Sequence, residues 1–153
     1  MSSSEEKQHH YGIVKKSIQI NASKEKVWKK ISNIVGLSWL VGVQKTVFLS
    51  KNKTGIGAIR KITFDNGNNI REIIVGWKAG QYFSYIATSG LPLRAYHATI
   101  SIQQLDQKVA KVSWQSFFNS EKMTKKEFSE FQNFMNTFYR DSLLNLKSSL
   151  ENN

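Results

Sequence analysis

A basic and an acidic residue lie on either side of a turn sequence and could together anchor a polar group of a ligand. Arg60 precedes Asp65-Asn66-Gly67 and Glu72 follows it, each within a run of residues typical of a β-strand. Asn-Gly between two such runs indicates a β-hairpin, which brings its two strands side by side. A buried ion pair carries a desolvation cost, so a ligand-anchoring pair and a purely structural cross-strand pair both stay open as interpretations.

Two registers of this hairpin are compatible with the sequence. A two-residue Asn-Gly turn would set Lys61 opposite Glu72. A three-residue loop with its glycine in the left-handed conformation would instead set Arg60 opposite Glu72. The same loop would set Ile62 opposite Ile70. The second register is favoured, because opposed Ile–Ile and Arg–Glu pairs both stabilise a sheet.

Proton transfer needs a positioned acid or base, and two side chains of the strand region are candidates, Glu72 and Tyr96. His97 follows Tyr96 directly, so strand alternation places it on the opposite, outer face. The sequence shows no Ser-His-Asp order, no paired carboxylates and no cysteine. The adjacent pair His9-His10 lacks a third ligand, so neither a metal site nor a cofactor is expected.

The net charge of +11, from 22 basic and 11 acidic residues, favours anionic partners. The lysines are spread along the chain without an Arg-rich run or a nucleic-acid motif, so no nucleic-acid partner is expected. Contact with an acidic membrane surface stays open as an alternative. No apolar run reaches the roughly 18 residues of a membrane span. The N-terminus also lacks the apolar core of a signal peptide, so we expect a cytoplasmic protein.

The elements that must position these residues end in one long helix, from Thr124 to about Leu150. Thr124 and Glu127 have the spacing of a capping box, in which each side chain accepts a hydrogen bond from a backbone N–H of the other residue. No Gly or Pro interrupts the segment. Its apolar residues recur at helical spacing and require a large surface to cover them. They are Phe128, Phe131, Phe134, Met135, Phe138, Tyr139, Leu143 and Leu146.

The rest of the chain is predicted to be mainly strands. A length of 153 residues with 40% hydrophobic residues suits one domain, preceded by a flexible tail over residues 1–11. Strands are expected at 13–20, 43–50, 58–64, 68–77, 81–88, 94–104 and 109–118, a helix at about 23–34, and one short helical turn at 36–40. Consecutive strands with short connections indicate an antiparallel sheet, and the long helix would cover one face of it.

This order of elements resembles the helix-grip fold of the START-related, birch-allergen-like (SRPBCC) superfamily. Within it, the chain is most similar to the polyketide cyclase/dehydrase and lipid-transport group, with one such domain over residues 12–151. One departure is that Val41 replaces a proline found two residues after the family's tryptophan. The matching positions are Val27-Trp28, Trp39, Gly57, Arg60, Gly67, Glu72, Tyr85, Pro92, Tyr96, Trp114 and Phe118.

The resemblance implies an α+β fold in which a curved antiparallel sheet of about seven strands wraps around the C-terminal helix. The order of elements would be one strand, two helices, six strands and the long helix. The resemblance also implies a cavity between sheet and helix that holds a hydrophobic or amphipathic small molecule. For each aromatic residue taken singly, a role in a solid core is the alternative. The residues expected to line the cavity are Trp39, Arg60, Glu72, Tyr85, Tyr96, Trp114, Phe131, Met135 and Phe138.

Three functions fit these observations. The first is binding of a lipid-like or polyketide-like molecule without catalysis, with selectivity set by the shape of the cavity. The second is a cyclase or dehydratase that uses the same cavity, with Glu72 or Tyr96 in proton transfer. The third is a peripheral module whose lysine-rich surface docks on acidic lipid or on a partner. Whether the protein is an enzyme stays open at this point.

Overall fold

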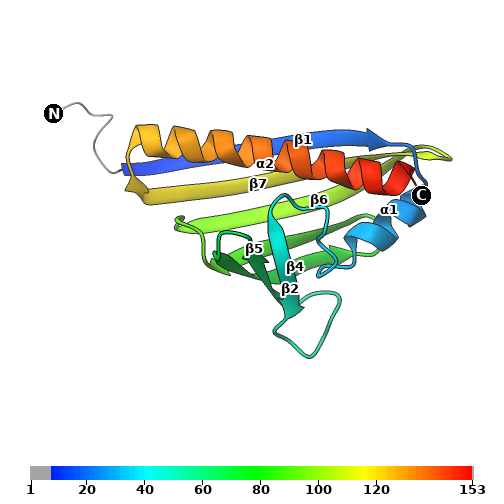
Figure 1. Ribbon diagram of the computed structural model, residues 1–153, viewed down its shortest axis with the longest axis horizontal. Helices are drawn as coiled ribbons and strands as arrows, with labels where there is room; N and C mark the ends of the chain where they lie inside the picture. Colours follow the sequence, from blue (N-terminus) through cyan, green and yellow to red (C-terminus); the bar gives the residue numbers. More distant parts are fainter. Residues whose placement is uncertain (1–7, 153) are drawn as a thin grey trace.

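The computed structural model describes residues 8–152 and contains one antiparallel sheet and two helices within that range. The sheet curves around the inner side on which the long helix lies, and the short helix lies at one end (Figure 1). This arrangement confirms the predicted helix-grip architecture. The elements are β1 (Gln8–Ile20), α1 (Lys24–Ile31), β2 (Val43–Phe48), β3 (Ile59–Phe64), β4 (Asn69–Lys78), β5 (Tyr82–Ser89), β6 (Ala95–Asp106), β7 (Val109–Met123) and α2 (Lys125–Glu151).

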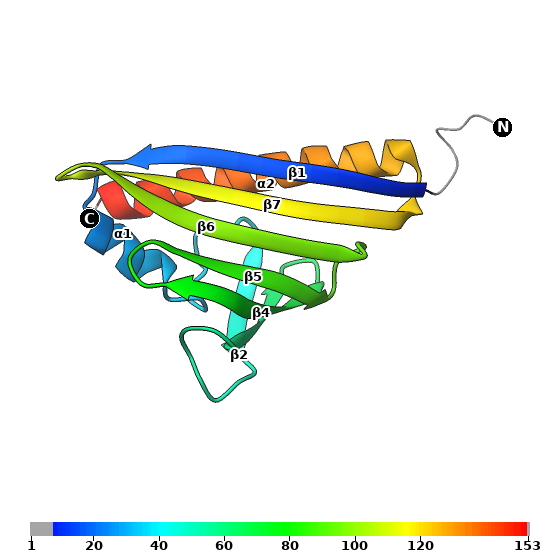
Figure 2. The same cartoon turned by 180° about the vertical axis from the view of Figure 1, so that it is seen from behind.

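The seven strands lie in the order β1-β7-β6-β5-β4-β3-β2, so the run from β2 to β7 is a meander and β1 closes one edge beside β7. All six pairings are antiparallel. Seen from behind, the strands form the near layer and α2 lies beyond β1 and β7 (Figure 2). Two side chains of α2 also bond to backbone carbonyls of the edge strand β1: Gln132 donates to Ile13 O at 3.1 Å and Lys147 to Gln19 O at 2.8 Å.

The hairpin between β3 and β4 has the three-residue loop favoured from the sequence. Arg60 is opposite Glu72 and Ile62 is opposite Ile70. Gly67 has a φ of 89°, a left-handed conformation that costs a glycine little because it has no Cβ. The alternative register, with Lys61 opposite Glu72, does not occur. The turn residues therefore place Arg60 and Glu72 within contact range of each other.

The N-terminal strand starts earlier than predicted, at Gln8 instead of about residue 13. Residues 8–11 therefore belong to the sheet and not to a tail, and the remainder of the predicted tail lies outside the described residues. The predicted start of the strand was wrong because the polar residues at 8–10 do not show the alternation of apolar and polar residues that is typical of a strand. His10 and Tyr11 pair with Ser120 and Asn119 of β7, whose own strand extends to Met123.

The segment after α1 makes a turn where one was predicted, within residues 36–40, but that turn is not a helix, so the second helix of the predicted order is absent from this described segment. Helix α1 ends at Ile31, and the chain then makes a hydrogen-bonded turn in which Leu40 N donates to Leu37 O at 2.9 Å. The turn does not continue as a helix, because the next backbone N–H, that of Val41, donates to Ser142 Oγ of α2 at 3.1 Å and not to a carbonyl of the turn. A proline at position 41 could not make this bond, since it has no N–H. The departure from the family pattern thus ties this loop to α2.

Helix α2 begins with the predicted capping box. Glu127 N donates to Thr124 Oγ1 at 3.1 Å, and Thr124 N donates to Glu127 Oε1 at 2.9 Å. We expect Thr124→Ala to lower the free energy of unfolding by about 1 kcal/mol, because a backbone N–H of the first turn loses its acceptor. Urea unfolding measures this loss. Ser129→Ala, at an exposed position of the same helix, is the matched control and is expected to change stability little.

The core lies between the inner face of the sheet and the two helices. Buried alternate residues of β6 and β7, such as Ala98, Ile100, Val112 and Trp114, belong to one cluster with buried residues of α1 and α2. The Trp114 and Tyr139 rings stack with centroids 3.7 Å apart and planes 6° from parallel. No helix in the described part of the chain is long and apolar enough to cross a membrane.

Candidate ligand-binding cavity

A cavity of about 570 Å³ lies between the sheet and α2. All nine residues predicted from the sequence line it: Trp39 from the turn after α1, Arg60 and Glu72 from β3 and β4, Tyr85, Tyr96 and Trp114 from β5, β6 and β7, and Phe131, Met135 and Phe138 from α2. The tertiary structure therefore brings residues from seven different segments to one place. That they contact a ligand stays a prediction.

The mouth of the cavity contains residues that the sequence did not point to. They come from the β3–β4 loop, from the β5–β6 loop and from the exposed side of α2. Pro92 was the available indication, because a single proline gives its loop a defined shape. These additional lining residues include Asp65, Asn66, Gly90, Leu91, Pro92, Phe134, Thr137 and Asp141.

Arg60 and Glu72 form a buried ion pair in the cavity wall, with about 3 and 5% of each residue exposed. Arg60 Nε donates to Glu72 Oε1 at 3.0 Å, and Arg60 Nη2 lies 2.8 Å from the same oxygen. Arg60 Nη1 donates to the backbone carbonyl of Ile34 at 2.8 Å. The guanidinium also lies 4.9 Å from the centre of the Tyr85 ring. Each nitrogen of Arg60 is therefore engaged by the protein itself.

Glu72 has one oxygen left for a ligand. Oε1 receives both contacts from Arg60, whereas Oε2 accepts no hydrogen bond from the residues that the structure describes. Burial raises the pKa of this carboxyl above 4.5, although the charge and hydrogen bonds of Arg60 act in the opposite direction. A carboxyl group with a raised pKa and a free oxygen can accept a hydrogen bond or exchange a proton with a bound molecule.

Three tyrosines form a polar cluster beside this pair. Tyr85 Oη accepts a hydrogen bond from Trp114 Nε1 at 3.0 Å, and the hydroxyls of Tyr96 and Tyr139 are hydrogen-bonded to each other. Burial raises the pKa of Tyr96 well above 10, and the neighbouring tyrosines add to this shift. Tyr96 therefore stays protonated at neutral pH and can donate a hydrogen bond, but the raised pKa makes it a weak acid, and the neutral phenol is a poor base.

The remaining wall is aromatic and aliphatic. Trp39 meets Trp114 edge to face at 5.8 Å, and Phe138 lies 6.0 Å from Trp114. Trp39 Nε1 is buried and has no acceptor among the described residues. The described part of the chain holds no group of three His, Cys, Asp or Glu side chains suited to a metal ion. The chemistry of this wall is that of a site for an apolar molecule with a few polar groups.

Comparisons with known proteins agree with this geometry. Residues 12–151 match the family model described as polyketide cyclase / dehydrase and lipid transport. No curated protein matches the chain significantly in sequence.

Solved structures share the fold at low sequence identity. The protein XoxI from Bacillus cereus is 21% identical, with a TM-score of 0.76 over 94% of this chain and 95% of that chain. Norcoclaurine synthase from Thalictrum flavum, solved with dopamine and hydroxybenzaldehyde, is 16% identical, with a TM-score of 0.71 over 94% and 87% of the two chains. Because the family model spans nearly the whole described chain and the helix-grip fold is present, the chain belongs to the polyketide cyclase/dehydrase and lipid-transport family of the START-related superfamily.

Proposed function

We propose that this protein binds a hydrophobic or amphipathic small molecule, lipid-like or polyketide-like, in the cavity between the sheet and α2. The observation that carries the proposal is the cavity itself, because about 570 Å³ is within the range of small-molecule sites. A closely packed interior leaves few voids larger than a water molecule, so a hollow of this size serves a guest and not the fold.

The polar groups indicate how such a guest is oriented. Glu72 Oε2 is an acceptor inside an apolar wall, and the mouth carries two further acidic residues, Asp65 and Asp141. Arg60 directs one N–H of each of its three nitrogens to Glu72 or Ile34, so its charge is already paired with Glu72. A ligand with a hydroxyl or amine group therefore fits the inner wall better than a ligand with a free carboxylate, which Glu72 would repel.

Native mass spectrometry of the protein purified from cells tests the binding proposal. We expect a mass increment from a co-purified ligand that organic extraction removes. Fluorescence of the cavity tryptophans should then respond to an added hydroxyl-bearing amphiphile and much less to a fatty acid of equal length. A protein that carries no ligand and takes up neither class of amphiphile would contradict the proposal. The cytoplasmic location expected from the sequence stays a prediction.

A second candidate function is a cyclase or dehydratase reaction in the same cavity. It is favoured by the raised pKa of Glu72 and by its free oxygen, which together suit a general base. Tyr96 would act as a hydrogen-bond donor to the substrate, because its raised pKa keeps the phenol protonated. Of the two residues predicted for proton transfer, Glu72 is thus the better base and Tyr96 the better donor.

Glu72→Gln separates the two functions. If the protein is an enzyme, this change is expected to reduce turnover of a cyclisable polyketide by about 100-fold, because the base is lost. Affinity for the substrate should fall far less, since the amide keeps an acceptor oxygen beside Arg60. Tyr85→Phe, which removes one cavity hydroxyl without touching Glu72, is the control. Binding without turnover in the unaltered protein would leave the carrier function alone.

A further inference from the structure

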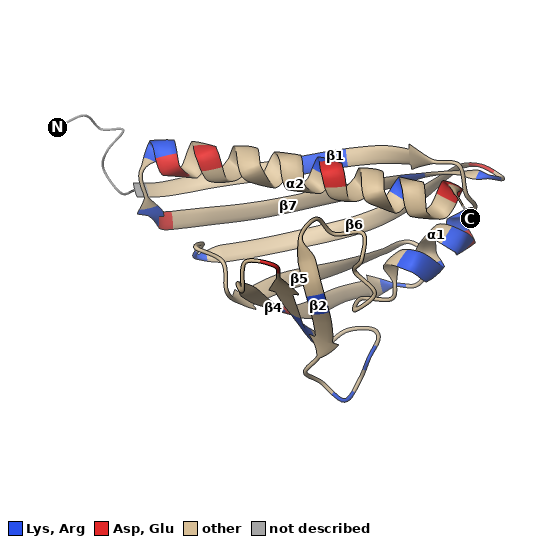
Figure 3. Cartoon of the chain, viewed as in Figure 1, with Lys and Arg blue, Asp and Glu red and all other residues tan. Residues whose placement is uncertain are grey.

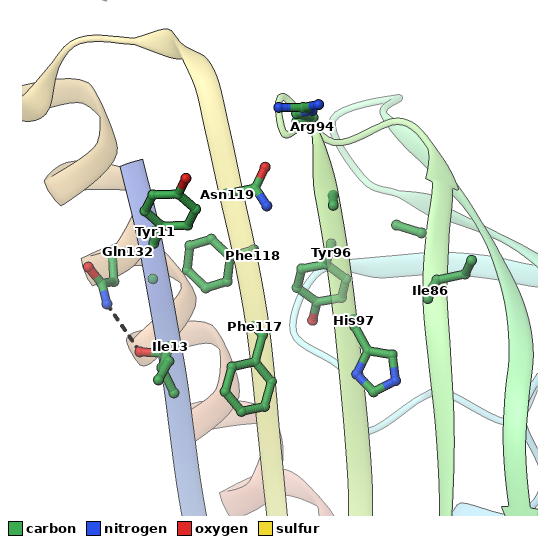
Figure 4. A pocket seen from close by; sticks show the side chains of 13 residues that line it. Tyr11, Ile13, Ile86, Arg94, Tyr96, His97, Phe117, Phe118, Asn119 and Gln132 are labelled. Carbon is green, nitrogen blue, oxygen red and sulfur yellow. Dashed lines mark hydrogen bonds between the residues drawn. The ribbon is translucent and has the colours of Figure 1, made fainter. Parts of the chain in front are cut away.

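The outer face of the sheet carries a row of apolar residues that the cavity does not explain. Six residues are directly paired across six neighbouring strands, and five of them are apolar. Figure 4 shows four of them side by side on β1, β7, β6 and β5. We refer to this row as the outer stripe; its members are Ile13, Phe117, His97, Ile86, Ile73 and Ile59.

The outer stripe differs from the rows on the side of it away from Tyr11. The next row along the strands is Lys15, Gln115, Thr99 and Ser84, and the row after it contains Ser17, Ser113 and Ser101. An antiparallel sheet with one covered face normally shows such polar residues on the other face. An exposed apolar row beside such polar rows therefore needs a separate physical reason.

The stripe is accessible, and no element of the described chain covers it. Ile13 is 54% exposed and Phe117 is 51% exposed, while Tyr11, two residues before Ile13 on the same face, is 75% exposed. An open hollow of about 820 Å³ lies over Tyr11, Ile13, Phe117, His97 and Ile86. Its lining also includes Gln132 of α2 and Tyr96, which lines the cavity as well, but Ile13, Phe117, His97 and Ile86 line the hollow and not the cavity.

Basic residues flank the stripe on the same face. Lys15, Arg71 and Lys61 each lie two residues from a stripe member, on β1, β4 and β3, and strand alternation points them outward. The structure gives none of the three an ion pair within the described residues. At one end of the hollow, Glu121 Oε2 lies 3.6 Å from Arg94 Nη1 and 3.4 Å from His9 Nε2. The negative charge of Glu121 is therefore already paired with Arg94. Seen from the side on which α2 lies, Lys and Arg are scattered over both helices, the loops and some of the strands (Figure 3).

We propose that the outer stripe docks on an anionic membrane surface. An apolar row with a partly exposed tyrosine can enter the boundary between headgroups and acyl chains, while lysine and arginine side chains beside it reach the phosphates. The net charge of +11 adds long-range attraction to such a surface.

Other occupants satisfy only part of the stripe. A second copy of the chain would bring Lys15, Arg71 and Lys61 of both molecules to the same interface, and like charges would oppose the contact. Nucleic acid would attract the flanking charges, but its phosphate backbone offers no apolar surface that could contact the apolar row. The combination of an apolar row and unpaired basic residues is complementary to an acidic bilayer.

Co-sedimentation of the full-length protein with vesicles tests the proposal. We expect binding to vesicles of phosphatidylcholine and phosphatidylserine, weaker binding at high salt, and little binding to phosphatidylcholine alone. Phe117→Ser is expected to lower the partition coefficient by about tenfold, because an inserted ring is lost. Lys15→Gln combined with Arg71→Gln is expected to lower the partition coefficient by about 25-fold, at about fivefold for each charge near the surface.

Matched controls lie elsewhere on the chain. Leu144→Ser removes an apolar residue that is 50% exposed on α2, and Lys29→Gln with Lys30→Gln removes two charges on α1. The first is expected to leave the partition coefficient unchanged, and the second to lower it less than the Lys15 and Arg71 pair does. Because the stripe side chains point away from the core, the thermal unfolding of the stripe variants should match the unaltered protein.

Three outcomes would overturn the proposal. The first is no binding to anionic vesicles by the unaltered protein. The second is vesicle binding that the stripe variants and the control variants reduce equally. The third is a dimer in solution that Phe117→Ser dissociates while vesicle binding is absent, which would assign the stripe to a second copy. Ligand uptake by the cavity is measured separately, so its failure does not affect this test.

Discussion

Replacing Arg60 by alanine is expected to lower the free energy of unfolding at neutral pH by about 3 to 5 kcal/mol, the usual cost of leaving a buried charge without its partner. Glu72 Oε1 would lose both contacts with the guanidinium, and the carbonyl of Ile34 would lose its donor. Urea unfolding measures the loss. The contact between the guanidinium and the Tyr85 ring disappears as well, so the cavity wall should lose packing at Tyr85.

The size of this loss is expected to depend on pH. Burial raises the pKa of Glu72 above 4.5, and Arg60 acts against that rise, so the pKa rises further when Arg60 is removed. A carboxyl whose folded-state pKa is raised stabilises the fold most at pH values below its unfolded pKa, and this contribution is lost as the pH rises through the folded pKa. Arg60→Ala should therefore lose less stability near pH 4.5 than at neutral pH.

A double substitution provides the control for the ion pair. Arg60→Met combined with Glu72→Leu replaces both charges by apolar groups of similar volume, which often has little effect on stability. We expect this variant to be markedly more stable than Arg60→Ala at neutral pH and to show a weaker pH dependence. An equal loss in both variants, or a loss in Arg60→Ala that does not change with pH, would mean that the pair's charges are not buried as described.

Met135→Trp is expected to weaken ligand binding by about 100-fold while leaving the fold nearly as stable. Met135 is buried on α2 and lines the cavity, so a larger side chain at this position would fill part of the volume that a ligand needs. A fall in affinity of about 100-fold corresponds to about 3 kcal/mol of binding free energy. Native mass spectrometry and ligand titration measure the change in binding, and urea unfolding measures the change in stability.

Leu146→Trp is the matched control on the same helix. Leu146 is fully buried and does not line the cavity, so the added ring must displace packed atoms. Overpacking of this kind typically costs about 1 to 3 kcal/mol. If Met135→Trp destabilised the protein as much as Leu146→Trp, the interior beside α2 would be filled and the proposed binding function would fail.

Much of the fold could be predicted because its determinants are local in the sequence. Alternation of apolar and polar residues located the strands, and the Asp65-Asn66-Gly67 turn set the register that pairs Arg60 with Glu72. The spacing of Thr124 and Glu127 located the start of α2. Such patterns depend on a few neighbouring residues, so they can be recognised without knowledge of contacts between distant parts of the chain.

The errors occurred where distant contacts override local preference. The first strand begins at Gln8 because β7 extends to pair with it, which its own polar residues do not indicate. The turn after α1 does not become a helix, because Val41 N bonds to Ser142, 101 residues away. In both places the deciding partner lies at the far end of the chain.

The sequence by itself determined the helix-grip fold, the hairpin register and the identity of the residues able to line a cavity. The tertiary structure alone decided that these residues enclose about 570 Å³, that Arg60 bonds to Glu72 and Ile34 while Glu72 Oε2 stays free, and that Ile13, Phe117, His97, Ile86, Ile73 and Ile59 form one row. The physical reason is that a strand's own pattern fixes only which side each residue faces. Where residues of different strands and helices meet depends on the register and packing of the whole sheet.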